Sequence, residues 1–269
     1  MIDQDTVAII ADAFDRQADS FDEYEEGNRI LLWMRSVIHK HMLSYVRRGD
    51  HLLELNAGTG IDAIFFAQNG VSVHAIDISR KMLERLKGKI RENGLSELVY
   101  AEQRSFRNLE GFRPHTFNHI FSDFGGLNCT SQPDFVIRQF RRLLKPGGTV
   151  TLVMMPPVCP WEILFALKGN FQLAFRRLQK HGTRSHVEGV IFRSYYFTPR
   201  RLIGFFGDEY SLLDLRGLGS LVPPPYLDRF PTRYPRLFEL LSHLDVRLSK
   251  RFPFHSWADH FILTMRYEP

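Results

Sequence analysis

The sequence predicts a doubly wound α/β fold, in which a seven-stranded, mostly parallel sheet is covered by helices on both faces. From residue 51 onward, five short apolar strand patterns alternate with helical patterns. Each of these helical patterns ends at an Asn-Gly, Gly or Pro-Gly-Gly turn, and parallel strands require such helical crossovers. The 269 residues are 44% hydrophobic, so the chain has the apolar side chains that a core of this kind needs.

The N-terminal part of the chain is predicted to be helical. Apolar residues recur at helical spacing within residues 6–48, which predicts two helices separated by an acidic stretch. No strand is expected before residue 51. We therefore interpret residues 1–48 as an N-terminal helical lid and residues 49–269 as the main domain.

The five strands of the expected sheet are separated by three helices. The strand patterns are HLLEL at 51–55, VSVHAID at 71–77, LVYAE at 98–102, FNHIFSD at 117–123 and TVTLVMM at 149–155. The helical patterns are 61–68, 80–93 and 131–144, and Ser79 is a suitable N-cap for the second. A parallel sheet of this kind binds ligands at the carboxyl ends of its strands, so site residues are expected there.

Beyond residue 155 the alternation is less regular. We expect an amphipathic helix at 161–178, a strand at 189–197, a short helix at 198–207, another strand at 210–217 and a final strand at 258–268 that can run antiparallel. Insertions at about 156–197 and 219–254 are expected to cap the strand ends. The apolar face of the 161–178 helix is expected to pack as core or against the sheet, rather than to line a substrate channel: Trp161, Leu164, Phe165, Phe171, Phe175 and Leu178.

Composition excludes several classes of protein. A net charge of +5 from 35 basic and 30 acidic residues does not by itself indicate a nucleic-acid binder. The two cysteines, Cys129 and Cys159, are too few for a disulfide framework, and the N-terminus lacks the pattern of a signal peptide, so we expect a cytoplasmic protein. No apolar run approaches the ~18 residues that cross a bilayer, which argues against a transmembrane segment.

The strongest motif is the glycine-containing turn ELNAGTG at 54–60, between the first strand and the following helix. Glycines let a ligand approach the backbone closely, and the start of the helix offers free N–H groups. Asp77 ends the second strand, 17 residues after Gly60. A carboxylate at this place suits hydrogen bonds to ribose hydroxyls, so the two features together indicate a nucleoside-containing ligand.

These motifs resemble those of the class I S-adenosylmethionine-dependent methyltransferases. The resemblance covers about residues 10–155 and the closing strands, and it rests on ELNAGTG, the acid in AIDISRKML, the strand FNHIFSDFGG, and LKPGG before the fifth strand. The acidic stretch FDRQADSFDEYEEGN is similar to the N-terminal segment that folds over the cofactor in many small-molecule members. The resemblance implies a Rossmann-like fold and S-adenosylmethionine as cofactor.

The resemblance also implies roles for particular residues. Glu54 would reach toward the methionine amino group, Asp77 would hold the ribose and Ile78 would lie against the adenine. Where the family has an acid near the adenine amine, this chain has Arg104-Ser105-Phe106, in which Ser105 could still form a hydrogen bond. The remaining positions form the cofactor loop or face the methionine part and the methyl acceptor: Asn56, Ala57, Gly58 and Gly60 in the loop, and Ser122 and Asp123 at the end of the fourth strand. Asn56 replaces the usual first glycine of the loop.

The chemistry that this cofactor supports is an in-line displacement of an activated methyl group by the lone pair of the acceptor. A base is needed where the acceptor must lose a proton. The sequence does not choose among the candidates for this base, all of which lie in the insertions: His181, His186, Tyr195, Tyr196, His243 and His255. We expect no metal site, because His39 and His41 are two residues apart on a helix and face different ways.

Residues 168–201 contain eight basic side chains and a single acidic one, Glu188. A solvated helix face is the favoured interpretation of this patch. Binding of an anionic amphiphile, or peripheral contact with an acidic membrane surface, is the alternative.

We interpret the protein as an enzyme that transfers a methyl group to a small hydrophobic or anionic molecule. A nicotinamide-dependent oxidoreductase is an alternative, because Gly58–Ala63 also fits the GxGxxA pattern, but the chain has no Tyr-x-x-x-Lys pair. An RNA or protein methyltransferase is a second alternative, although SDFGGL stands where adenine-methylating enzymes have Asp/Asn-Pro-Pro-Tyr. A non-catalytic cofactor-binding subunit is the third. The sequence does not indicate an oligomeric state.

Overall fold

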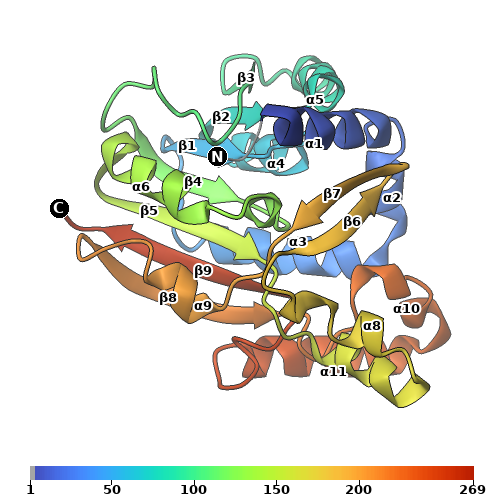
Figure 1. Ribbon diagram of the computed structural model, residues 1–269. Helices are drawn as coiled ribbons and strands as arrows, with labels where there is room; N and C mark the ends of the chain where they lie inside the picture. The colour runs from blue at the N-terminus through green and yellow to red at the C-terminus, as the bar shows by residue number, and fades with distance from the viewer. Residues whose placement is uncertain (1–3) are drawn as a thin grey trace.

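The computed structural model describes residues 4–269 (Figure 1). The first three residues of the expected lid lie outside the described residues. The main sheet has seven strands in the order β3-β2-β1-β4-β5-β9-β8. Their bounds are β1 His51–Leu55, β2 Ser72–Asp77, β3 Val99–Gln103, β4 Phe117–Ser122, β5 Leu144–Met154, β8 Tyr210–Leu218 and β9 His260–Tyr267.

Pairing within the sheet matches the sequence-based expectation. Strands β3, β2, β1, β4 and β5 pair with their neighbours in parallel, whereas β9 is antiparallel to both β5 and β8. The strand order reverses at β1, which lies between β2 and β4. At the carboxyl edge, Leu55 of β1 pairs with Ile76 of β2 on one side and with Ser122 of β4 on the other. Chain connections leave in opposite directions at such a point, and this opens a crevice above the strand ends.

Helices cover both faces of the sheet because successive strand residues point to opposite sides. Leu52 belongs to a core with α4 (Ile61–Gln68) and α5 (Arg80–Glu92), and its neighbour Leu53 belongs to a second core with α6 (Pro133–Leu143). Ser79 caps α5, as predicted, by accepting a hydrogen bond from the backbone N–H of Met82. Within residues 4–269, no helix combines the length and the apolarity needed to cross a bilayer.

The N-terminal region has three helices instead of the expected two: α1 Gln4–Gln17, α2 Phe21–Gly27 and α3 Arg29–Met42. Asn28 is the reason, because its backbone leaves the helical region at φ −103° and ψ 101°. Its side chain then accepts hydrogen bonds from the N–H groups of Ile30 and Leu31 and caps α3. The acidic stretch is therefore a separate short helix.

The segment after β5 differs most from expectation. Residues 160–178 form isolated turns instead of one helix: α7 Pro160–Ile163, η2 Leu164–Lys168, α8 Phe171–Ala174 and η3 Arg176–Leu178. Gly169 adopts φ +76° after η2 and ends the helical path. Four members of the expected packed face are exposed, so the prediction that this face packs as core or against the sheet is wrong: Leu164, Phe171, Phe175 and Leu178.

The expected strand at 189–197 belongs to a separate hairpin. β7 (Val190–Ser194) pairs with β6 (Thr183–Val187), which the sequence pattern did not indicate, and neither joins the main sheet. Phe192 packs against Phe14 of α1, with ring centroids 6.1 Å apart. The remaining elements are η1 Gly126–Cys129, α9 Pro199–Ile203, η4 Pro225–Leu227, α10 Phe230–Arg233 and α11 Pro235–Leu248. The hairpin therefore supports the N-terminal helices (Figure 1).

Candidate functional site

The turn after β1 is tied to the turn after β4 by Asn56. Its amide nitrogen donates to the carbonyl of Asp123 at 3.0 Å, and its amide oxygen accepts from the Ser122 hydroxyl at 2.6 Å. Asn56 adopts φ +50°, which Asn tolerates better than most residues. A Cβ at Gly126 would lie 2.1 Å from this amide, so the two turns approach as closely as a glycine allows. Asn56 thus stands where the loop was expected to have a glycine, and its side-chain amide links the two turns by hydrogen bonds.

Asp77 organises the glycine turn from the neighbouring strand. One carboxylate oxygen accepts from the backbone N–H of Gly58 and the other from that of Ser79, each at 2.8 Å. Burial raises the pKa of Asp77, although these two backbone hydrogen bonds act in the opposite direction. A Cβ built at Gly58 would meet no atom within 4 Å, so the turn leaves open space beside the carboxylate.

A cavity of about 290 Å³ lies above these two turns. Eight of the eleven predicted cofactor residues line it: Asn56, Ala57, Gly58, Asp77, Ile78, Ser105, Phe106 and Asp123. The other three lie behind its wall. Glu54 is 2% exposed, Ser122 is fully buried with its hydroxyl on Asn56, and Gly60 faces α5, where a Cβ would lie 2.1 Å from Leu86 Cδ1. Ser122 was expected to face the ligand, but its hydroxyl is bound to Asn56 instead. Gly60 is required because a larger residue there would collide with α5.

The N-terminal helices supply the opposite wall, which the sequence-based prediction did not resolve into residues. Its side chains are mostly apolar or aromatic, with Glu25 and Arg35 as the charged members: Val7, Ile10, Phe14, Phe21, Tyr24, Glu25, Leu31 and Arg35. The apolar spacing in this segment was a signal for a packed helix. It gave no indication that the buried face covers a cavity instead of solid core.

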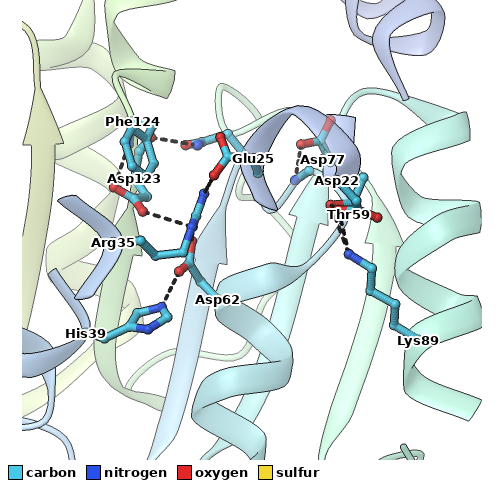
Figure 2. A network of polar contacts seen from close by, with 12 residues as sticks. Asp22, Glu25, Arg35, His39, Thr59, Asp62, Asp77, Lys89, Asp123 and Phe124 are labelled. Carbon is cyan, nitrogen blue, oxygen red and sulfur yellow. Dashed lines mark hydrogen bonds and ion pairs between the residues drawn. The ribbon is translucent and has the colours of Figure 1, made fainter. Parts of the chain in front are cut away.

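Arg35 is the centre of a buried ion network whose members line the cavity (Figure 2). Its guanidinium lies 2.6 Å from Glu25, 2.5 Å from Asp62 and 3.5 Å from Asp123. Its central carbon lies 4.7 Å from the ring centroid of Phe124, at cation–π distance. Burial opposes the charge on Arg35, but these carboxylates outweigh burial and hold its pKa above the usual value.

The carboxyl groups around Arg35 differ in their protonation. Although burial opposes charge on Asp62, Arg35 and the 2.5 Å contact with His39 hold its pKa below the ordinary range. Burial, reinforced by the charge of Asp62, raises the pKa of Asp123 well above its ordinary value. Burial also raises the pKa of Glu54, and Glu54 Oε2 has no hydrogen-bond partner within the described residues. An unpartnered buried carboxyl oxygen favours a ligand that brings a hydrogen-bond donor.

Three aspartates of the N-terminal segment fasten it to the main domain. Asp15 accepts from the Ser79 hydroxyl at 2.5 Å, Asp19 pairs with Arg85 at 2.7 Å, and Asp22 pairs with Lys89 at 2.7 Å. The Thr59 hydroxyl of the glycine turn also donates to Asp22, at 2.6 Å (Figure 2). The acidic stretch thus holds the cavity wall in place through contacts with α5 and the glycine turn.

None of the six expected proton acceptors lines this cavity among the residues that the structure describes. His181, Tyr195 and Tyr196 line a different hollow, next to the β6–β7 hairpin. Their placement therefore gives none of these six candidates a contact with the cavity. Insertion 219–254 contributes Pro225 to the cavity wall.

Six of the eight basic side chains in segment 168–201 are exposed, as a solvated face requires, whereas Arg176 and Arg177 form ion pairs with buried carboxylates. Arg176 and Arg177 each lie 2.7 Å from Glu162, and Arg177 also lies 2.6 Å from Asp259. Cys159, Glu162 and Asp259 bring their ligand atoms within 4.8 Å of one another, as a metal site would require. Arg177 already binds both carboxylates, so its guanidinium supplies the positive charge that a metal ion would bring to this cluster.

Comparisons with known proteins agree with this geometry. Residues 52–148 match a family model described as a methyltransferase domain. A demethylmenaquinone methyltransferase of Lactobacillus johnsonii is 31% identical over 173 residues, which cover 60% of this chain and 69% of that protein. The chain belongs to the class I S-adenosylmethionine-dependent methyltransferases.

Other methyltransferases match over shorter stretches. A phosphatidylethanolamine N-methyltransferase of Cereibacter sphaeroides is 31% identical over 106 residues, or 39% of this chain and 51% of that protein. The aligned part of the chain spans about half the length of such curated relatives. A crystal structure of the Burkholderia thailandensis 1,6-didemethyltoxoflavin-N1-methyltransferase gives a TM-score of 0.61 at 13% identity, covering 100% of this chain and 92% of that one. At this identity the likeness concerns the fold.

The residues at the cavity fit S-adenosylmethionine, the cofactor of the family. The cofactor has a sulfonium that suits the surplus of carboxylates around Arg35. Its ribose hydroxyls suit the free lone pairs of Asp77, and the open space at Gly58 admits a ligand against the backbone.

Proposed function

We propose that this chain binds S-adenosylmethionine in the cavity above β1 and β2 and transfers its methyl group to a small hydrophobic acceptor. The observation that carries the proposal is that one cavity is lined both by the Gly58 turn with Asp77 and by the carboxylates around Arg35. A nucleoside would occupy the first part and a cationic sulfur the second. The nicotinamide alternative leaves the surplus carboxylates unexplained, because they would face a phosphate-bearing ligand.

In this proposal, each wall of the cavity has its own task. Asp77 would accept hydrogen bonds from the ribose, and Ile78 and Phe106 would contact the adenine. Asp123 and Glu54 would lie toward the methionine part, where Arg35 keeps the neighbouring carboxylates in place. The family's cofactor supplies an electrophilic methyl group, so the chain has to align the acceptor with it and exclude water.

The acceptor is proposed to be hydrophobic because the wall from the N-terminal helices is largely apolar. Relatives are named as ubiquinone/menaquinone biosynthesis C-methyltransferases, for example that of Methylococcus capsulatus at 33% identity, which supports an apolar acceptor. An anionic acceptor would face repulsion from Glu25 and Asp62, which form ion pairs with Arg35. Where the acceptor must lose a proton, Asp123 is the candidate base, because it lines the cavity next to the carboxylates around Arg35 and burial raises its pKa.

We also propose that α1 and α2 act as the lid of this site. The salt bridges of this segment to Arg85 and Lys89 are partly exposed and contribute little energy, so the buried pair of Glu25 with Arg35 is the contact that opening has to break. Both cysteines are unpaired. This supports a reducing compartment such as the cytoplasm as the place of action.

Two measurements test the proposed function. Calorimetric titration should show binding of S-adenosylhomocysteine and no binding of NADH. Incubation with radiolabelled S-adenosylmethionine and fractions of a bacterial extract should then transfer label to an organic-soluble product. Binding of NADH instead of S-adenosylhomocysteine would favour the oxidoreductase, and cofactor binding with no transfer to any fraction would favour a non-catalytic subunit.

A further inference from the structure

The turns between Ile163 and Leu178 expose an unusual concentration of apolar side chains. Within the described residues, 21 large hydrophobic side chains are exposed, and six of them fall in these 16 positions. We call these six residues the apolar patch: Ile163, Leu164, Leu167, Phe171, Phe175 and Leu178. Leu167 is 85% exposed and Phe171 is 62% exposed. Scattered exposed apolar residues are normal, but a cluster of this kind indicates an interaction surface.

The patch stands on a rigid base. Glu162, at its start, is buried and receives hydrogen bonds from Arg176 and Arg177, near its end. Arg177 is in turn bound to Asp259, next to β9. Trp161 donates from its indole nitrogen to the carbonyl of Leu221 at 2.9 Å. The segment is therefore fixed at both ends, and the exposure of the side chains between them is a property of the fold.

The charge around the apolar patch is positive. Glu162 is the sole acid in residues 160–184, and it is already neutralised by Arg176 and Arg177. Lys168, Lys180 and Arg184 are exposed and form no salt bridge with any residue that the structure describes. Apolar side chains that protrude between unpaired cations complement a surface with an apolar interior and anionic groups above it.

We propose that the apolar patch docks this protein on the surface of an anionic lipid bilayer. Leu167 and Phe171 would enter the region between headgroups and acyl chains, while Lys168 and Lys180 would remain at the level of the phosphates. The structure supports surface attachment without a span. The turns are short, lie at one end of the molecule near α10 and α11, and leave the cavity under α1 free (Figure 1).

The test is sedimentation of the full chain with two kinds of vesicle, phosphatidylcholine alone and phosphatidylcholine mixed with phosphatidylglycerol. The protein should bind the mixed vesicles, and about 0.5 M salt should weaken this binding because it screens the lysines. The double variant Leu167→Ser/Phe171→Ser should lower the partition coefficient about tenfold or more, because it removes the two apolar side chains that would be buried in the bilayer. Lys168→Glu/Lys180→Glu should lower binding to the mixed vesicles alone.

Tyr100→Ser is the matched control, because Tyr100 is 62% exposed on β3, away from the patch. It should leave vesicle binding unchanged, and thermal melting should show that all variants stay folded. Wild-type protein that ignores the mixed vesicles, or a Leu167→Ser/Phe171→Ser variant that binds as well as wild type, would overturn the proposal. It would also be overturned if light scattering showed a dimer that this variant separates, since a second copy would then cover the patch. Each readout is independent of methyl transfer.

Discussion

The substitution Asp77→Ala removes the carboxylate that links the glycine turn to the second strand. If Asp77 also holds a ribose, each of its oxygens accepts one backbone N–H and keeps a lone pair for a ligand hydroxyl. Hydrogen bonds to a charged group contribute about 1.5–3 kcal/mol. We therefore expect the binding of S-adenosylhomocysteine to weaken by about 2 kcal/mol, which corresponds to roughly 30-fold in Kd.

The same substitution also affects folding, so the two effects must be measured separately. The N–H groups of Gly58 and Ser79 lose their acceptor, and we expect the free energy of unfolding to fall by about 1–2 kcal/mol in urea. Calorimetry is then done at a temperature where the variant is folded. Asp134→Ala is the matched control, since it removes the same charge from the surface of α6, where Asp134 pairs with Arg138. Wild-type affinity in folded Asp77→Ala would refute the ribose assignment.

Three further predictions concern the packing around the site. Arg35→Ala should lower the free energy of unfolding by about 3–5 kcal/mol, because Glu25 and Asp62 are left buried without their cation. Gly60→Ala should cost about 2 kcal/mol, because the residue adopts φ +79° and its Cβ would collide with Leu86. Burial lowers the pKa of His41 to about 4, so acid favours the unfolded chain, which binds a proton below its ordinary pKa of 6.5. Stability should fall by about 2 kcal/mol between about pH 7 and pH 5, and His41→Gln should remove this part of the fall.

Urea denaturation measures all three, each against its own control. Arg85→Ala breaks an exposed salt bridge and should cost at most about 1 kcal/mol, so an equal loss in Arg35→Ala would contradict the buried network. Gly27→Ala has open space and no positive φ, and it should be neutral; equal effects of the two glycine changes would argue against strain at Gly60. For His41, an unchanged pH dependence in the glutamine variant would show that other groups cause it.

Local sequence patterns were sufficient to predict the elements that follow a regular alternation or a helical apolar spacing. Strand β2 and helix α5 followed from alternation, from the Ser79 cap and from helical apolar spacing. The pairing of the glycine turn with Asp77 followed from the rule that parallel strands end at one edge. These features depend on residues that are close together in the sequence, so a local pattern is enough to predict them.

Contacts between residues that lie far apart in the sequence could not be predicted from local patterns. Arg35 was an ordinary helical residue until the fold placed it against Asp62 and Asp123, 27 and 88 positions away. The division of the acidic stretch depends on the cap at Asn28, and the interruption at Gly169 depends on a positive φ that a helical pattern does not reveal. Buried ion pairs and broken helices are decided by tertiary packing, which local propensity describes poorly.

The most direct test of the central claim is a crystal structure of this chain with S-adenosylhomocysteine. We predict that the adenosine lies between the Gly58 turn and the Asp77 carboxylate, with the sulfur of the ligand toward Asp123. A ligand found on another surface of the molecule, or a cavity above Gly58 that stays closed at saturating ligand, would contradict the account.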